Sequence, residues 1–243
     1  MKILAYPLSA LYYIFFGLTL VIMHIVQWLC FNLGGYKPHH ASVKIMNFLL
    51  IGCTKLLGTT HKFKGRKLLP KNTPIIFVSN HQSVFDISPT EWYLSDFHPK
   101  FISKIELGKG IPSVSYNLQH GGSVLIDRKD PRQALPEIKK LSQYIEKHNR
   151  SAIIFPEGTR SRDGKLKYFR DSGLKMLLKF APSALIVPIT INNSWKIVKN
   201  GSFPLSLGIP FSVEIHAPLN PKEFEFEVLM EEIQKSIRST LKN

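Results

Sequence analysis

The sequence predicts an α/β fold in which helices flank a layered, mixed β-sheet, with a pair of hydrophobic helices at the N-terminus. Two observations favour this class. After residue 59, short apolar runs that suit strands alternate with amphipathic stretches that suit helices. Before it, residues 3–36 contain no Lys, Arg, Asp or Glu. Hydrophobic residues make up 44% of the 243 residues, so the chain can form a large core and is not predominantly disordered.

The first hydrophobic segment is long enough to enter a membrane. About 20 apolar residues cross a bilayer as a helix, and residues 3–36 exceed both that length and the apolar region of a signal peptide. His24 and Gln27 lie one helical turn apart within it, and we expect this polar spot to contact a second helix. The alternative is a buried hairpin in the core of a soluble protein.

The second helix is expected at residues 42–58, after a turn at Gly34-Gly35. Polar side chains share one face and apolar side chains the other, which is typical of a helix at a membrane interface. The polar set is Lys44, Asn47, Thr54 and Lys55, and the apolar set is Ile45, Met46, Leu49, Leu50, Cys53, Leu56 and Leu57. The predicted organisation is therefore a membrane anchor at 1–58 and a second domain at 59–243.

This second domain is expected to contain six strands and three longer helices. The strands are Ile75–Ser79, Lys100–Ser103, Ser123–Ile126, Ala152–Phe155, Leu185–Ile191 and Phe211–His216. One helix begins at Asp130-Pro131 with a capping box completed by Gln133, one covers residues 172–180, and the last begins at Asn220-Pro221. Pro188 predicts an edge or bulged position for its strand, because proline cannot donate to a sheet ladder.

The charge balance favours anionic partners. Lys and Arg number 32 against 17 Asp and Glu, a formal charge of +15, which suits nucleic acid or an anionic membrane. The hydrophobic N-terminus favours the membrane. The two cysteines, Cys30 and Cys53, form neither a disulfide framework nor a metal-binding spacing. The motifs of serine hydrolases (G-x-S-x-G), P-loop proteins and dinucleotide-binding proteins are absent from the sequence.

The stretch VSNHQSVFD contains the first candidates for catalysis, His81 and Asp86. It follows an apolar strand, and ligands of open α/β sheets collect beyond the carboxyl ends of strands. Residues five apart on a regular helix point about 140° away from each other, so the two side chains can meet only if the chain turns between them. An aspartate bonded to one imidazole nitrogen leaves the other free to take a proton. A polar turn without catalytic function is the alternative.

A second polar loop, IIFPEGTRSRDGKL at 153–166, also follows a strand. Gly158 permits close approach of a ligand, Thr159 offers a hydroxyl, and Arg160 offers a planar group suited to phosphate. An ordinary surface loop with a salt bridge from Glu157 to Arg160 or Arg162 is the alternative. Lys104 and Arg128 are further cations at the ends of predicted strands, where a structural or solvated role is equally open.

Together and in this order, four stretches resemble the 1-acyl-sn-glycerol-3-phosphate acyltransferase family of glycerolipid acyltransferases. They are NHQSVFD at 80–86, GSVLIDR at 122–128, FPEGTRS at 155–161 and VPITI at 187–191. The resemblance covers roughly residues 60–220. It implies a membrane-bound enzyme that transfers a fatty acyl group from an acyl thioester to the free hydroxyl of lysophosphatidic acid, giving phosphatidic acid.

The resemblance also implies roles for the candidate residues. His81 would be the general base and Asp86 its partner. Arg160, Gly158 and Thr159 would bind the acceptor phosphate with Glu157 ordering the loop, and Lys104 and Arg128 are weaker candidates for the same anionic pocket. Acyl-CoA or acyl–acyl carrier protein would be the donor, without a metal or other cofactor, and no Ser or Cys is placed to form an acyl-enzyme.

The expected partners are the lysophospholipid, the thioester donor and anionic membrane lipids, not nucleic acid. If the first helix spans the membrane, the lysines that follow it place the catalytic domain on the cytoplasmic face. A hairpin held in one leaflet remains open. Two other functions also remain open: the same chemistry on another acceptor (a different lysophospholipid, glycerol 3-phosphate or a lyso-aminolipid), and a non-catalytic protein that binds anionic membranes or nucleic acid.

Overall fold

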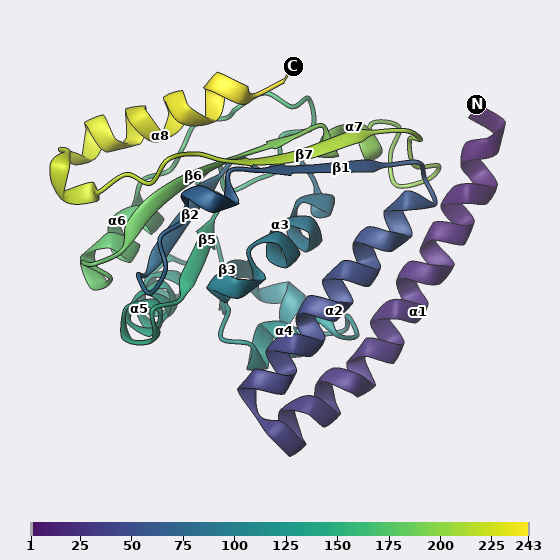
Figure 1. Ribbon diagram of the computed structural model, residues 1–243, viewed down its shortest axis with the longest axis horizontal. Helices are drawn as coiled ribbons and strands as arrows, with labels where there is room; N and C mark the ends of the chain where they lie inside the picture. The colour runs from purple at the N-terminus through teal and green to yellow at the C-terminus, as the bar shows by residue number, and fades with distance from the viewer. Residues whose placement is uncertain (1, 243) are drawn as a thin grey trace.

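A seven-stranded mixed sheet forms the centre of the molecule, as the computed structural model of residues 2–242 shows (Figure 1). The strand order is β1-β7-β6-β2-β5-β3-β4, and β6 and β7 are antiparallel while the other neighbours are parallel. The predicted α/β class with a mixed sheet is confirmed. The strands are β1 (Thr60–Lys64), β2 (Ile75–Ser79), β3 (Pro99–Lys104), β4 (Val124–Ile126), β5 (Ser151–Ile154), β6 (Leu185–Asn192) and β7 (Pro210–Ile215).

All six predicted strands occur with bounds shifted by no more than a residue at either end. The sequence missed β1, whose side chains are alternately exposed and half-buried at the edge of the sheet. Phe63 is its only large apolar residue, so the strand carries a weak hydrophobic signal.

The expectation for Pro188 was wrong, because β6 lies inside the sheet between β7 and β2. The antiparallel ladder with β7 begins only at Ile189, so the missing N–H of Pro188 lies just outside it. The Pro188 carbonyl accepts the backbone N–H of His216 at 3.0 Å. A central strand tolerates this proline because its ladder on one side starts one residue later.

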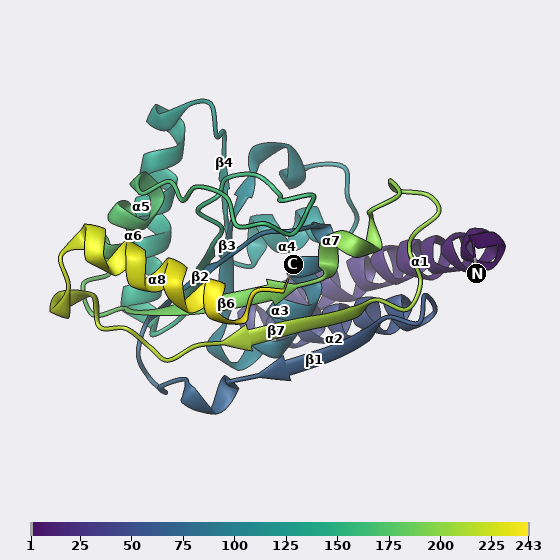
Figure 2. The same cartoon turned by 90° about the horizontal axis from the view of Figure 1, so that it is seen from above.

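Helices cover both faces of the sheet (Figures 1 and 2). On one face, buried residues of β2, β5 and β6 pack against α5 (Pro131–His148), α6 (Ser172–Phe180) and α8 (Phe226–Thr240). On the other, the alternate residues of the same strands pack around α3 (Ile87–Tyr93). The alternation follows from the two-residue period of a strand buried on both faces.

One predicted capping box and one predicted helix start need correction. The Asp130 side chain caps α5 by accepting N–H groups of Arg132 and Gln133, but Gln133 bonds Asp127 and Leu125 rather than closing a capping box. Asn220 caps a short 3-10 turn, and α8 begins later, at Phe226. One face of α8 is buried through Leu229, Ile233 and Ile237.

The N-terminal helices α1 (Lys2–Gly34) and α2 (Tyr36–Lys55) form the predicted hairpin, with Gly35 at φ 71° in its turn. Glycine adopts this left-handed conformation without a steric penalty. The Gln27 side chain is fully buried and its amide donates to Met46 Sδ on α2 at 3.1 Å. His24 instead accepts from the backbone N–H of Ser113, before α4 (Val114–His120). The polar spot thus ties α1 to two elements.

The face assigned to α2 from sequence was wrong in part. The helix begins earlier than predicted, at Tyr36, and its polar residues Asn47 and Thr54 are buried. Both satisfy their hydrogen-bonding groups locally, by donating to the carbonyls of Val43 at 3.0 Å and Ile51 at 2.7 Å. These bonds lower the cost of burying the two polar side chains. The apolar residues Ile45 and Leu49 lie on the exposed side of the helix.

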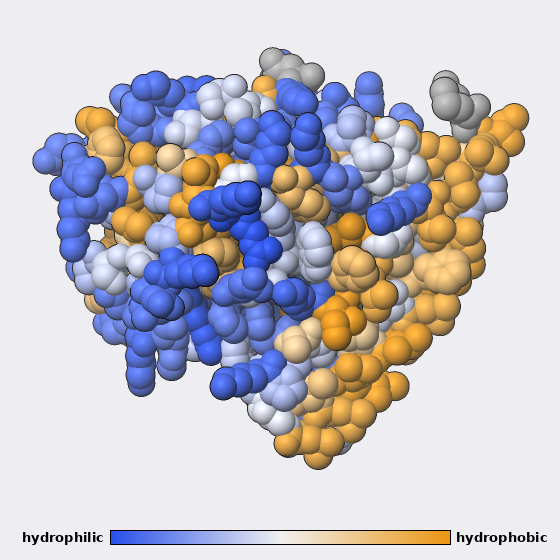
Figure 3. Space-filling model, viewed as in Figure 1, coloured by the Kyte–Doolittle hydropathy of each residue, from blue (hydrophilic) through white to orange (hydrophobic). Residues whose placement is uncertain are grey.

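The outer surface of the hairpin is apolar, as the hydrophobic band over α1 in Figure 3 shows. The α1 helix is long and apolar enough to cross a membrane, and only 17% of its most apolar 18-residue stretch is buried. A core helix of a soluble protein would be largely covered, so this exposure argues against the buried-hairpin alternative. Exposed apolar residues of α1 include Leu11, Ile14, Phe15, Leu18, Val21, Ile22, Ile25, Trp28 and Leu29.

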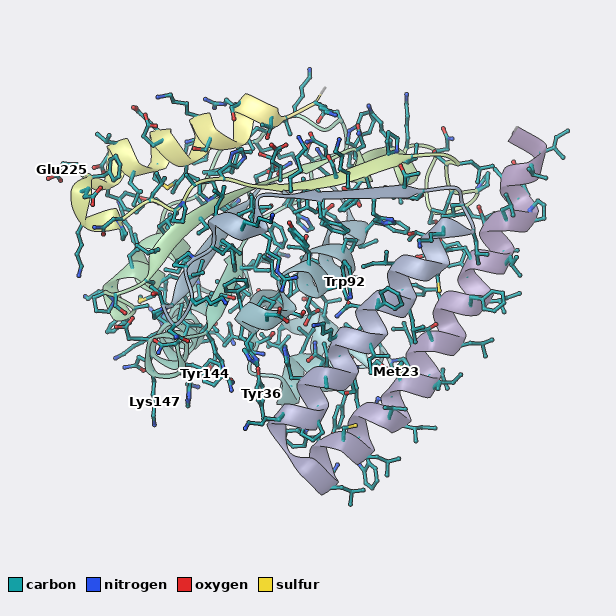
Figure 4. All side chains as sticks on the ribbon, in the orientation of Figure 1. Met23, Tyr36, Trp92, Tyr144, Lys147 and Glu225 are labelled. Carbon is teal, nitrogen blue, oxygen red and sulfur yellow. The ribbon has the colours of Figure 1, made fainter. Side chains whose placement is uncertain are left out.

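Trp92 connects the hairpin to the sheet domain. It lies on α3, beside α2 in Figure 4, and its ring packs on Phe48 of α2 and Phe63 of β1 with centroids 5.8 and 5.6 Å away. Aromatic contacts of this kind bury a large apolar area and add specific ring–ring attraction. The inner face of the hairpin is therefore part of the folded structure, although its outer face is not covered.

Replacement of Ile76 by alanine tests the two-layer core. Ile76 is fully buried in β2 against the layer that contains α5, α6 and α8. We expect Ile76→Ala to lower the free energy of unfolding by about 2–5 kcal/mol, since the side chain leaves a cavity. Denaturant unfolding in detergent measures this change. The control is Ile45→Ala, at a position 54% exposed, and an equal loss in both variants would contradict the assignment.

Candidate active site

Four neighbouring parallel strands place the candidate residues at one edge of the sheet. His81 follows β2, the loop containing Glu157–Arg160 follows β5, Lys104 ends β3, and Arg128 follows β4. These strands are adjacent in the order β2-β5-β3-β4, so their carboxyl ends meet. A cavity of about 840 Å³ lies there, lined among others by His81, Lys104, Arg128, Thr159 and Arg160.

His81 and Asp86 form a hydrogen-bonded pair. The His81 Nδ1 to Asp86 Oδ2 distance is 2.7 Å, and the short helix Val84–Asp86 supplies the turn that the spacing required. Ser83 caps this helix with its hydroxyl. The chain therefore turns between the two residues, as the sequence required for their side chains to meet.

The Asp86 carboxylate is fully buried and surrounded by donors. Oδ2 accepts the backbone N–H groups of Gln82 at 2.7 Å and Ser83 at 3.0 Å in addition to the imidazole, and Oδ1 accepts the hydroxyl of Ser194. Hydrogen bonds from several donors offset the cost of burying this polar group. The carboxylate is therefore held in place next to His81 Nδ1.

The imidazole orientation follows from these contacts. Since Asp86 accepts from Nδ1, the neutral ring carries its proton there and Nε2 is left as the acceptor. The ring stacks on Phe155, with centroids 4.3 Å apart and an interplanar angle of 22°. The side chain is 12% exposed and lines the cavity. His81 is thus held rigidly and can accept a proton from a molecule in the cavity.

Glu157 connects the two polar loops. Its Oε1 accepts the backbone N–H of His81 at 2.9 Å and its Oε2 accepts that of Lys167 at 3.3 Å. The backbone N–H of Ser161 in turn donates to the His81 carbonyl at 2.7 Å. Among the described residues, the carboxylate makes these bonds rather than the salt bridge to Arg160 or Arg162 that the sequence left open.

Gly158 and Arg128 shape the same loop. Gly158 has φ 68°, a conformation that favours glycine, and its carbonyl accepts the Arg128 guanidinium. Burial lowers the pKa of Arg128, opposed by Glu106 and reinforced by Arg170 and Arg160. An anion in the cavity would relieve this cost because it supplies the missing counter-charge.

The cavity is rimmed by more cations than the sequence singled out. Arg162 and Lys167 also line it, and Lys167 Nζ donates to the Arg160 carbonyl at 2.7 Å and to Thr159 Oγ1 at 3.3 Å. Arg162 lies just beyond the FPEGTRS motif, and Lys167 comes from a polar run without a recognisable pattern. No spacing in the sequence predicts that Lys167 returns to the loop.

A second cavity adjoins the first beneath the N-terminal hairpin. It measures about 390 Å³ and is lined chiefly by apolar side chains of α1, α2, α3 and α4. The two cavities share Val84, Ile87, Phe101, Ser103 and Leu107 as lining residues. An apolar space therefore lies directly beside the cation-lined one.

Asn80, the first residue of the NHQSVFD motif, has a structural role that the sequence did not predict. Its side chain is buried, donates to the Ile191 carbonyl at 2.8 Å and accepts the Ile191 N–H at 2.7 Å. This two-point contact joins the loop after β2 to β6. Within residues 2–242, no group of three or more His, Cys, Asp or Glu side chains is placed to hold a metal ion.

Comparison with known proteins establishes the family. Residues 60–192, more than half of the chain, match the family model described as Acyltransferase. The chain belongs to this acyltransferase family, and the resemblance inferred from the four motifs is confirmed.

Two relatives share part of their sequence with the chain. A chloroplastic 1-acyl-sn-glycerol-3-phosphate acyltransferase of Arabidopsis thaliana is 32% identical over 179 residues, covering 73% of this chain and 48% of that protein. A 1-acyl-sn-glycerol-3-phosphate acyltransferase of Helicobacter pylori is 37% identical over 127 residues, covering 49% and 51%. The chain spans about half the length of these curated relatives.

A solved structure shares the fold along the whole chain. The crystal structure of the 1-acyl-sn-glycerophosphate acyltransferase PlsC from Thermotoga maritima superposes with a TM-score of 0.78, covering 97% of this chain and 93% of the other. The sequence identity is 24%, so this comparison supports the architecture, including its N-terminal helices.

The titration of Glu157 predicts a pH dependence of stability. Burial raises its pKa to about 7, whereas the pKa of a glutamate in an unfolded chain is about 4.3. Between these values the folded protein retains a proton that the unfolded chain releases. The free energy of unfolding therefore loses this contribution as the pH rises from about 4.5 to about 7.

Glu157→Gln removes this titration and should show a smaller fall in the free energy of unfolding over that interval. Denaturant titrations in detergent at several pH values measure the difference. Glu231→Gln, at an exposed position of α8, is the matched control and should follow the wild type. Identical pH profiles for wild type and Glu157→Gln would contradict the assignment.

Proposed function

We propose that the protein transfers a fatty acyl group from an acyl thioester to the free hydroxyl of lysophosphatidic acid, giving phosphatidic acid. The observation that carries this proposal is the His81–Asp86 pair in a cation-rimmed cavity that adjoins an apolar one. Lysophosphatidic acid has a phosphate, a hydroxyl and an acyl chain that match these three parts. The names of the relatives agree with this substrate.

The first step uses His81 as general base. Nε2 takes the proton of the acceptor hydroxyl as that oxygen attacks the thioester carbonyl, and Asp86 stabilises the imidazolium that forms. The carbon–sulfur bond then breaks, and His81 returns the proton to the departing thiolate. The ester forms directly and the free thiol of the carrier leaves, so protons and electrons balance without a cofactor.

The cations around the cavity suit the acceptor phosphate. Arg160 supplies a planar guanidinium and Thr159 a hydroxyl at the cavity wall. Gly158 precedes them, and its φ of 68° shapes the loop that would receive the phosphate. Lys104 and Arg128 line the same cavity, on the strands next to β5. Glu157 orders this loop against the His81 backbone. The donor, acyl-CoA or acyl–acyl carrier protein, is also anionic and would be attracted by the net charge of +15.

The hairpin suits an amphiphilic substrate. Its exposed apolar face would embed in a membrane that supplies the lysophospholipid, and the catalytic domain would lie on the cytoplasmic side with anionic lipids near its cations. The apolar cavity under α1 and α2 is placed to receive an acyl chain beside His81. Membrane anchor and active site would therefore share one substrate path.

Replacement of His81 tests the chemistry. We expect His81→Ala to lower kcat by roughly 10²–10⁴-fold, the usual contribution of a general base, without releasing the protein from anionic liposomes. His148→Ala, at an exposed position at the end of α5, is the control and should retain full activity. Normal turnover by His81→Ala would rule out the mechanism. Liposome binding without turnover of any thioester by the wild type would favour the non-catalytic alternative.

Replacement of Arg160 tests the acceptor. We expect Arg160→Ala to raise KM for lysophosphatidic acid roughly 10-fold, since a hydrogen bond to a charged group is lost, with little effect on monoacylglycerol. The assay crosses both thioester donors with phosphorylated and unphosphorylated acceptors, including glycerol 3-phosphate and a lyso-aminolipid. Arg132→Ala, exposed on α5, is the matched control. Equal effects on all acceptors would show that Arg160 does not bind the phosphate.

A further inference from the structure

Ser194 contacts the catalytic pair from a distant part of the chain. It is the first residue of α7 (Ser194–Ile197), which follows β6, and it is fully buried. Its hydroxyl donates to Asp86 Oδ1, the carboxylate oxygen that does not face His81. It lies outside the four sequence motifs.

The Ser194 hydroxyl has one proton and two candidate acceptors. Gln82 Oε1 lies 3.4 Å away, farther than Asp86 Oδ1. A carboxylate is also the stronger acceptor, because hydrogen bonds to charged groups are shorter and more favourable than neutral ones. The proton is therefore directed at Asp86.

The two oxygens of Asp86 have different sets of donors. Oδ2 accepts from His81 Nδ1 and from the backbone N–H groups of Gln82 and Ser83. Within the described part of the chain, Oδ1 has one side-chain donor, Ser194. The torsion that rotates a carboxylate is soft, so a donor on the far oxygen restricts this rotation. Without that hydroxyl, the buried Oδ1 would lose its side-chain donor, and rotation of the carboxylate would lose the restraint on that side.

The position of Ser194 is itself fixed by tertiary contacts. The Asn80 amide makes two hydrogen bonds to the backbone of Ile191, which hold the end of β6 against the loop that carries His81. Asn193 has a left-handed φ of 68° and donates its side-chain amide to the Pro210 carbonyl at 2.8 Å. This turn directs the next residue, Ser194, toward Asp86.

We propose that Ser194 is a positioning residue for the reaction, acting through Asp86 to keep Oδ2 directed at His81 Nδ1. The inference rests on the proposed function, in which His81 is the base. A misaligned carboxylate stabilises the imidazolium less well while leaving the substrate cavity unchanged. The effect therefore falls on kcat and not on KM.

Four variants separate the hydroxyl from packing. Ser194→Ala removes the hydroxyl, and we expect kcat to fall roughly tenfold, the loss of one charge-assisted hydrogen bond, with KM for both substrates unchanged. Ser194→Thr keeps a hydroxyl, whereas Ser194→Val has the shape of threonine without one. We expect Thr to retain kcat within about threefold of wild type and Val to fall to the level of Ala. Ser142→Ala, at a fully buried serine that bonds Ile138 within α5, is the matched control and should keep kcat unchanged.

Thermal unfolding of each variant identifies any loss of kcat that comes only from misfolding. If Val does not fold, the Ala and Thr comparison decides the same point, because alanine cannot overpack the site. Equal kcat for the Thr variant and the variants without a hydroxyl, or a change in KM alone, would overturn the proposal. Full activity of His81→Ala would instead refute the proposed mechanism, in which His81 is the base. An inactive His81→Ala with equal Thr, Val and Ala variants would refute only the role of Ser194.

Discussion

The buried carboxylate of Asp86 is the interaction around which the site is built. A charge removed from water is costly unless it is surrounded by donors, and here two backbone N–H groups, an imidazole and a serine hydroxyl converge on it. These donors come from the loop after β2 and from the turn after β6. Their shared acceptor fixes the relation of both segments to the sheet. The same contacts that satisfy the charge also orient His81.

The rest of the site has the opposite electrostatic character. Lys104, Arg128, Arg160 and Lys167 surround the cavity, and burial lowers the pKa of Arg128. The Asp86 carboxylate holds His81, while the cations that line the cavity favour binding of an anion. This division suits a reaction in which the acceptor and the thioester carrier are both anionic. Asp163 also lines the cavity, and the nearby Glu157 carboxylate accepts backbone N–H groups and orders the loop.

The hairpin α1–α2 lines the apolar cavity that adjoins the active site. Its inner face packs on α3 and α4 and lines the apolar cavity, whereas its outer face remains uncovered. The polar residues Gln27, Asn47 and Thr54 are buried, and each donates a hydrogen bond, Gln27 to Met46 and the other two to carbonyls of α2. An uncovered apolar surface next to an active site for lipids brings the substrate source and the catalytic residues together.

The sequence by itself determined the α/β class, six of the seven strands, the hairpin, the family and the requirement that His81 and Asp86 meet across a turn. These features depend on local periodicity, capping and motif order, which are written along the chain. The tertiary structure alone decided that Pro188 lies in a central strand, that α2 presents Ile45 and not Asn47 outward, and that Lys167 and Ser194 join the site. Each depends on which distant segment packs beside it. A hydrogen bond between residues such as Ser194 and Asp86 leaves no local pattern, because only the parallel sheet brings them together.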